Sequence, residues 1–394
     1  MRKEDNTCAL RFRSLVFDDP LFFMRERSQP MTEYRFARPE EEAEVLDFIN
    51  AVFSQAARPH DFEKLIPKVY AHPGYAGMHA VAVEDGRIRG TVAMLPITVH
   101  AGESCLKAGY IGSVSVHPRF RGKGYMKELM AMQISEAKRR GMDFMALGGQ
   151  RQRYQYFGFS LYGGEISFSV TRANARHALP KDTLFSFAPA TERHAEKMAA
   201  LNERQTLYCQ RPRYWDAVRT YNGAPYVILE GDRFAGYLIV LGDRITELRL
   251  ERENDLPAVI AAWLREHKSC EILCYGYMKE RIRGLNAFAE AYDIGPSGMI
   301  KVLNWERVLR AALGLRALAD GERVIKIEGV GTFRLTVQNG RAEVLPCQAP
   351  PDFTWTPMEA ADTLFSPLNA LGVTDPVFRA WLPLTLDIPI ADQF

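Results

Sequence analysis

The residues best placed to do chemistry lie where an apolar strand ends at Val116 and two glycines lead into a helix. Gly122 and Gly124 allow successive backbone N–H groups to converge at the N-terminus of that helix. Such a cradle holds a pyrophosphate, and Arg121 and Lys123 add positive charge. The spacing is neither GxGxxG nor GxxxxGKS/T, which disfavours a Rossmann or a Walker site. The alternative interpretation is an ordinary basic turn between a strand and a helix.

The residues around this loop predict the sheet that positions it. A strand over Tyr34–Ala37 precedes a helix that opens with acidic residues and repeats apolar residues at helical spacing over 39–53. Two β-rich runs over residues 80–95 flank Asp85-Gly86, which is typical of a hairpin. Further strands are expected over Tyr110–Val116 and Asp143–Leu147, before and after the helix that follows Gly124.

The same hairpin plan returns around residues 227–241. The segment from Glu84 to Gly90 aligns with that from Glu230 to Gly236, and a second acid-started helix is expected over 191–207. We therefore expect a duplicated domain. In the second copy, residues 250–256 hold the place of the glycine loop with no glycine and three acids, which would repel a pyrophosphate.

The chain changes pattern after about residue 299. A helix is expected over Trp305–Leu313, and β-rich runs over 324–327 and 332–337 precede a tight turn at Asn339-Gly340. These elements predict a third unit of mixed helix and strand. Residues 383–394 are apolar for a tail and contain two prolines, so we expect the tail to be docked.

Composition narrows the class of protein. The chain has 394 residues, of which 47% are hydrophobic and 25% charged, as in globular proteins. A formal charge of +2 favours neither a nucleic-acid nor an acidic-membrane partner. Charged residues interrupt the first 30 positions, so no secretory signal is expected, and six sparse cysteines are typical of a cytoplasmic protein. Eight histidines without an HExxH pattern indicate no metal centre.

Two motifs in this order resemble those of the GNAT acetyltransferases. The run from Val114 to Gly124, Val-x-Val-x-Pro-x-x-Arg-Gly-x-Gly, resembles motif A of that family. Met126 departs from the family, which usually has Gly or Ala there, so the helix is expected to approach a pyrophosphate differently at this point. The segment from Tyr154 to Phe159, Tyr-Gln-Tyr-Phe-Gly-Phe, is similar to the family's Tyr-x-x-Phe-Gly-Phe/Tyr segment. The resemblance implies binding of acetyl-CoA.

The order of the units looks like that of the Eis-type acetyltransferases, which have two GNAT domains and a sterol-carrier-protein-like (SCP2-like) C-terminal domain. The resemblance implies an α/β fold with mixed sheets. It implies an N-terminal extension (1–31), a catalytic GNAT domain (32–172), a degenerate GNAT domain (173–298) and an SCP2-like domain (299–394). It also implies a homo-oligomer, a hexamer in that family, and acceptor amines such as aminoglycosides, polyamines or lysine side chains.

The resemblance also assigns residue roles. Tyr154 matches the family's general acid toward the CoA sulfur, with Tyr156 as its competitor, and the main-chain carboxylate of Phe394 corresponds to the general base. The alternatives are a buried aromatic residue and a hydrophobic tail that plugs its own domain. Contacts with acetyl-CoA are expected from the strand, the loop and the end of the next strand: Val114, Ser115, Val116, Arg121, Gly122, Lys123, Gly124, Tyr125, Met126, Gly149 and Gln150.

The leading hypothesis is therefore an acetyl-CoA-dependent N-acetyltransferase that acts on a primary amine. A second hypothesis is an acyl-CoA sensor or lipid-binding module, which would keep Arg121 to Gly124 but need neither Tyr154 nor a free C-terminus. A peptidyl transferase that uses aminoacyl-tRNA is disfavoured by the near-zero net charge. No nucleic acid, membrane or metal is expected as a partner.

Overall fold

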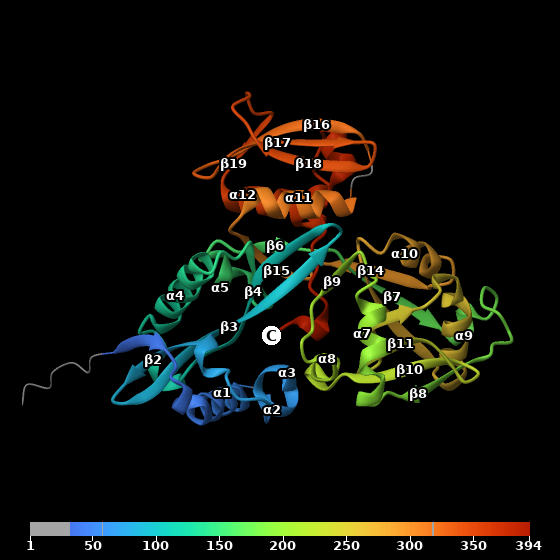
Figure 1. Cartoon of the computed structure of the whole chain (residues 1–394), viewed down its shortest axis with the longest axis horizontal. Coiled ribbons are helices and arrows are strands. Elements are labelled where there is room, and N and C mark those ends of the chain that lie inside the picture. The colour runs from blue at the N-terminus through green and yellow to red at the C-terminus, as the bar shows by residue number, and fades with distance from the viewer. Residues whose placement is uncertain (1–31, 57, 317–318) are drawn as a thin grey trace, which may run out of the picture.

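The protein is built from three β-sheets with their helices, as Figure 1 shows for the computed structural model. The structure describes residues 32–56, 58–316 and 319–394, so the predicted extension over 1–31 lies outside the described residues. The predicted α/β class with mixed sheets is confirmed. No helix in the described part of the chain combines the length and the apolar character needed to cross a membrane.

The first sheet carries the predicted glycine loop. Its strands lie in the order β1 (Glu33–Phe36), β2 (His79–Glu84), β3 (Arg87–Ala101), β4 (Ser104–Val116), β5 (Phe144–Leu147), β15 (Gly298–Val302) and β6 (Ser160–Tyr162), and β9 (Leu207–Cys209) pairs with β3. The helices of this unit are α1 (Glu42–Ala56), α2 (Phe62–Leu65), α3 (Pro67–Tyr70), α4 (Tyr125–Arg139) and α5 (Arg151–Gln155). The predicted hairpin turns at Asp85, and α4 begins directly after Gly124, as predicted.

The second sheet repeats this plan. Its strands lie in the order β14 (Ala291–Gly295), β7 (Glu165–Thr171), β13 (Ser269–Tyr275), β12 (Arg244–Leu250), β11 (Arg233–Leu241), β10 (Ala224–Glu230) and β8 (Phe185–Pro189). The helices are α6 (Arg172–Ala175), α7 (Ala195–Asn202), α8 (Tyr214–Ala217), α9 (Leu256–Glu266) and α10 (Lys279–Asn286). In both sheets an antiparallel hairpin leads to a third strand, a helix and a parallel strand, which supports the predicted duplication. The second copy's first helix is shorter than predicted, because α7 ends at Asn202.

The third unit is a small sheet covered by helices. Its strands lie in the order β18 (Arg341–Pro346), β17 (Gly331–Gln338), β16 (Gly321–Ile327) and β19 (Phe353–Trp355). The helices are α11 (Trp305–Arg316), α12 (Pro357–Phe365), α13 (Pro367–Ala370) and α14 (Pro376–Trp381). Figure 1 shows this unit above the other two, with α11 and α12 between its sheet and theirs.

Two strands lie in a different sheet from the one that the predicted boundaries imply. β7 falls within the predicted first domain (32–172), yet it pairs with β13 and β14 in the second sheet. β15 opens the predicted third domain (299–394), yet it lies between β5 and β6 in the first sheet. The buried Met299 and Ile300 suit an interior strand of that sheet. The first two units therefore exchange a strand across the predicted boundaries at 172 and 298.

The tail connects all three units. Leu384, Leu386 and Ile388 are fully buried, which confirms the predicted docking. Figure 1 shows the tail in red, running from the third unit between the first and second units and ending in the middle of the molecule. The last residue, Phe394, therefore lies far from its own sheet.

Candidate active site

The strand that leads to the glycine loop is bent at Ser113. β4 pairs in parallel with β5 only from Ala108 to Ile111, although β4 continues to Val116. Between Thr91 and Ala93 of β3 the register shifts by one residue, and Ser113 has a positive φ of 49°. This is a β-bulge, which bends a strand and redirects its side chains. Beyond the bulge the edge of β4 is therefore free of β5.

The glycine loop has the geometry that an anion cradle needs. Gly122 and Gly124 both have a φ of +83°, which favours glycine over residues with side chains. A Cβ atom at either position would meet nothing within 4 Å, so the space in front of the loop is open. No side chain in the described part of the chain caps α4 at Gly124. The N–H groups of Tyr125 and Met126 at its start are thus available to a ligand, whereas that of Lys127 donates to the Gly124 carbonyl at 2.9 Å.

A cavity of about 760 Å³ lies in front of this loop and the free edge of β4. Eight of the predicted contact residues line it: Val114, Ser115, Val116, Arg121, Gly122, Gly124, Tyr125 and Met126. Side chains that the sequence analysis did not single out complete the wall: Val52, Phe53, Ala56, Phe120, Lys127, Arg153 and Phe157, together with Tyr156, the predicted competitor. No motif marks the residues from α1, α4 and α5, because they meet only in the fold, whereas Phe120 and Phe157 lie within the two motifs but were not predicted as contacts.

Lys123 was predicted to add positive charge to the loop, but its charge is paired. Its ammonium group is paired with Glu84, at 2.8 Å from Oε1, and the hydroxyl of Tyr125 donates to the same carboxylate. The hydrogen bond from Lys123 lowers the pKa of Glu84, and in turn raises the pKa of Lys123. The side-chain charge of Lys123 is therefore largely neutralised by Glu84, which leaves Arg121 as the charged side chain of the loop on the cavity wall.

The two tyrosines of the aromatic segment lie at different depths. Tyr154 is buried, with 5% of its surface exposed, and burial raises its pKa. Tyr156 is 66% exposed, and its ring centroid lies 5.8 Å from the Lys127 ammonium on α4. Tyr154 thus lies in the interior beside β5, whereas Tyr156 lies on the wall of the cavity near the start of α4.

Gly149 and Gln150 contribute by placing Tyr154, and they do not line the cavity. A Cβ atom on Gly149 would lie 2.6 Å from Cε2 of Tyr154, so the ring packs directly on this glycine. The carbonyl oxygen of Gln150 accepts hydrogen bonds from the backbone N–H of Arg153, at 3.1 Å, and of Tyr154, at 3.4 Å. Their predicted direct contact with acetyl-CoA has no support from the cavity wall.

The backbone of Phe394 reaches the bulge. A Cβ atom on Gly112 would lie 2.6 Å from the carbonyl oxygen of Phe394 and 2.7 Å from its carbonyl carbon. Only a glycine at position 112 leaves room for this approach. The structure therefore brings the end of the tail against β4, one residue before Ser113, although the two segments are far apart in the sequence.

A buried chain of polar side chains lies next to the bulge, and no motif in the sequence predicted it. The hydroxyl of Tyr70 lies 2.7 Å from Oγ of Ser113 and 3.2 Å from Nε2 of His79. Nδ1 of His79 in turn lies 3.0 Å from Oγ1 of Thr91. Burial lowers the pKa of His79 to about 3, so the imidazole is neutral. The Tyr70 ring also packs against the ring of Phe394, with the centroids 6.0 Å apart.

The corresponding loop of the second sheet is closed by ion pairs. After β12, Glu253 pairs with Arg281, and Asp255 pairs with Arg252 at 2.8 Å. Arg281 is buried and also donates to the carbonyl oxygen of Leu248 at 2.9 Å. Carboxylates thus stand where the first sheet has open glycines. The described residues contain no group of three or more His, Cys, Asp or Glu side chains that could hold a metal ion.

Comparison with known proteins identifies the first unit. Residues 33–162 match the family model of the acetyltransferase (GNAT) domain. This segment contains the glycine loop, the free edge of β4 and Tyr154. Residues 33–162 are thus similar to a GNAT acetyltransferase domain. No curated protein sequence matches the chain significantly.

Solved structures show the same fold over nearly the whole chain. A conserved protein from Enterococcus faecalis V583, a probable N-acyltransferase, has a TM-score of 0.66 at 14% identity and covers 92% of this chain and 100% of its own. A GCN5-related N-acetyltransferase from Anabaena variabilis has 0.66 at 17%, with the same coverage. Eis1 from Mycobacterium abscessus has 0.64 at 18%, again with 92% and 100% covered. The likeness therefore extends beyond the GNAT domain to all three sheets.

Proposed function

We propose that the protein is an acetyl-CoA-dependent N-acetyltransferase that acts on a primary amine. The observation that carries this proposal is one juxtaposition. An open glycine loop, a free strand edge and the carbonyl end of Phe394 follow one another along β4, from Gly124 to Gly112. A thioester bound along this line would have its anionic part at the loop and its acetyl group toward Phe394.

The residues present fit acetyl-CoA. We assign the pyrophosphate to the backbone N–H groups from Gly122 to Met126, with Arg121 as the charged side chain. The backbone of Val114–Val116, beyond the pairing with β5, can hydrogen-bond the amides of the pantetheine chain as an added strand would. Acetyl-CoA supplies an acetyl group activated by its thioester.

Two groups of the chain would move the protons. The Phe394 carboxylate accepts the proton of the amine as the new C–N bond forms to the acetyl carbon. The Tyr154 phenol gives its proton to the sulfur as the C–S bond breaks. Burial raises the pKa of Tyr154, so its phenol is protonated at neutral pH and has a proton to give. Tyr156 lies near the start of α4, at the loop end of the cavity.

The three units suggest the Eis-type arrangement. The repeated sheet plan supports two GNAT domains in tandem, and the helix-covered third sheet supports an SCP2-like domain. The full-length likeness to Eis1 from Mycobacterium abscessus agrees with this arrangement. We also propose the acceptors of this protein, which would be aminoglycoside-like amines, polyamines or lysine side chains.

The test is steady-state release of CoA from acetyl-CoA with a panel of amines: aminoglycosides, polyamines and lysine peptides. Turnover with one class of acceptor supports the enzyme. Tight binding of acetyl-CoA, measured by calorimetry, without turnover on any amine would contradict it and favour an acyl-CoA sensor. A heat-denatured sample controls for spontaneous thioester hydrolysis.

A further inference from the structure

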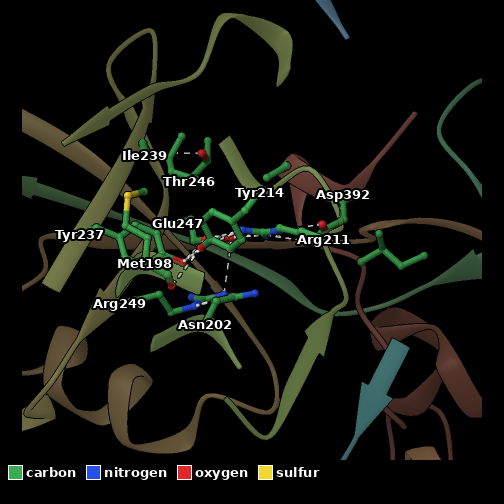
Figure 2. Close-up of polar contacts among 12 residues, drawn as sticks. Met198, Asn202, Arg211, Tyr214, Tyr237, Ile239, Thr246, Glu247, Arg249 and Asp392 are labelled. Atoms are coloured by element: carbon green, nitrogen blue, oxygen red, sulfur yellow. Dashed lines mark hydrogen bonds and ion pairs between the residues drawn. The ribbon is translucent and has the colours of Figure 1, made fainter. Parts of the chain in front are cut away.

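One buried arginine links the tail to the second sheet. Arg211, just after β9, donates from Nε and Nη2 to the two carboxylate oxygens of Asp392, at 2.7 and 2.8 Å. Its Nη1 and Nη2 also donate to Glu247 on β12, at 3.0 and 2.7 Å. The three side chains are between 1 and 4% exposed. Figure 2 shows Arg211 between the two carboxylates.

Glu247 is itself fixed by the second sheet. The hydroxyl of Tyr237 on β11 donates to it, and the Tyr237 oxygen accepts a hydrogen bond of 2.8 Å from Tyr214. Burial alone would raise the pKa of Glu247, but the guanidinium groups of Arg211 and Arg249 lower it to about 2. Glu247 is therefore ionised at neutral pH, and Arg211 has a rigid anionic partner on one side (Figure 2).

A lysine of the first unit also hydrogen-bonds the tail. Nζ of Lys68 on α3, whose pKa burial lowers to about 7, donates to the carbonyl oxygens of Ala391 and Gln393, at 2.7 and 2.6 Å. The side chain of Asp392 and both neighbouring carbonyl groups are thus held at once. Phe394 is the next residue, and its carbonyl end lies against Gly112.

Docking of the tail does not require these charges. Leu384, Leu386 and Ile388 already bury the tail upstream. Buried ion pairs add little net stability, because desolvation of the charges offsets their attraction. A bidentate pair does fix direction, and a misplacement of about 1 Å in an active site can cost about 100-fold in rate. These contacts are therefore suited to fixing the position of the end of the tail.

We propose that Arg211, Glu247 and Lys68 are positioning residues that set the Phe394 carboxylate beside the β4 bulge. This inference rests on the proposed function, in which that carboxylate takes the proton of the amine. It gives the second unit a part in the reaction: this unit has no open glycine loop, and it holds the base that acts in the first unit.

The test is a double-mutant cycle of Asp392→Asn with deletion of Phe394, read as kcat and as the KM for acetyl-CoA. Asp392→Asn keeps the side chain's size and removes its charge. We expect kcat to fall by a factor on the order of 10 to 100, with the KM within about twofold. Deletion of Phe394 leaves a residual rate about 10² to 10⁴ lower, which stays measurable. In the deletion background Asp392→Asn should cause no further loss.

Two further variants separate positioning from folding. Lys68→Met keeps the length of the buried side chain, and we expect it to lower kcat by the same factor. It replaces Asp392→Asn as the test if that variant does not fold. Asp255→Asn is the matched control, because Asp255 pairs with Arg252 in the same unit and does not contact the tail. Its kcat should stay within about twofold of the parent.

The outcomes separate the two proposals. Loss of activity on deletion of Phe394, with both Asp392→Asn and Lys68→Met at the parent rate, overturns the positioning role and leaves the base in place. A further loss from Asp392→Asn in the deleted chain also overturns it, because the residue would then act elsewhere. Full activity after deletion of Phe394 overturns the terminal base, and with it the positioning role.

Discussion

The loops after β4 and after β12 occupy the same position in two sheets of the same plan, yet their chemistry is opposite. After β4, Gly122 and Gly124 adopt positive φ and leave open space at the N-terminus of α4. After β12, Glu253 lies just before α9 and forms an ion pair with the buried Arg281 of α10. The first unit thus has a loop open to an anion, whereas the second has internal ion pairs at the same position.

In the second unit, β12 contacts the tail through Arg211. Glu247 lies on β12, the strand that precedes the closed loop, and it holds Arg211 and through it Asp392 of the tail. β9, just before Arg211, pairs with β3 of the first sheet. The two units are thus joined where the tail ends, and the strand exchange of β7 and β15 joins them further.

The largest expected effect is loss of acetyl-CoA binding in Gly124→Glu. The side chain adds a negative charge at the cradle and forces a φ of +83° on a residue with a Cβ. Like charges in contact cost several kcal/mol, so the Kd should rise by about 100-fold or more. Calorimetric titration with acetyl-CoA measures it. Glu253→Gln in the second unit is the matched control, and an equal loss there would break the comparison.

The next effect is a loss of rate in Tyr154→Phe. Removal of the phenolic proton should lower kcat by about 100-fold and leave acetyl-CoA affinity unchanged. Steady-state kinetics on the best acceptor of the panel measures it. Tyr156→Phe, on the outer wall of the cavity, should stay within about threefold of the parent. The reverse order of the two variants would assign the acid to Tyr156.

A smaller effect is expected from Arg281→Met, which opens the closed loop. The variant leaves Glu253 without its partner and removes one donor from the Leu248 carbonyl, which still accepts from Arg249 at 3.2 Å. Unfolding free energy should fall by about 1 to 3 kcal/mol, since Glu253 is partly exposed and can rehydrate. Chemical denaturation measures it. Acetyl-CoA affinity should not change, and a loss of affinity would place a cofactor contact in the second unit.

The smallest effect is a pH dependence of stability that comes from Glu247. Its pKa is about 2 in the folded protein against an ordinary value of 4.5, so its ionised form stabilises the fold above pH 4.5. This contribution is lost as the pH falls from about 4.5 to about 2. The difference in Tm between the parent and Glu247→Gln should therefore be larger at pH 7 than at pH 3. A difference that grows at low pH would contradict the ion pair with Arg211.

Local patterns in the sequence predicted the parts of the site that are local. The loop at Gly122 and Gly124, the turn at Asp85 and the apolar tail each depend on neighbouring residues, and the structure has them as predicted. Lys123 was predicted as a charge for the loop, but its partner Glu84 comes from β2, at the end of another strand. The residue types alone do not show which side chain a lysine will meet.

Long-range pairing could not be predicted from the residues. Neither β7 nor β15 was predicted as a strand, and their partners depend on contacts between segments far apart in the sequence. Arg211 and Asp392 are 181 positions apart, and no motif links them. The approach of Phe394 to Gly112 was anticipated only through the resemblance to the Eis-type enzymes, since a docked tail does not indicate where it ends.

The role of the Phe394 carboxylate as the base is tested most directly by the rate of amine acetylation, compared between the chain ending at Phe394 and a chain extended by Gly-Ser after Phe394. The extension moves the carboxylate away from Gly112 and leaves Arg211, Lys68 and the glycine loop unchanged. We expect kcat to fall by about 100-fold or more while the KM for acetyl-CoA stays within about twofold. An extended chain with the full rate would contradict this role.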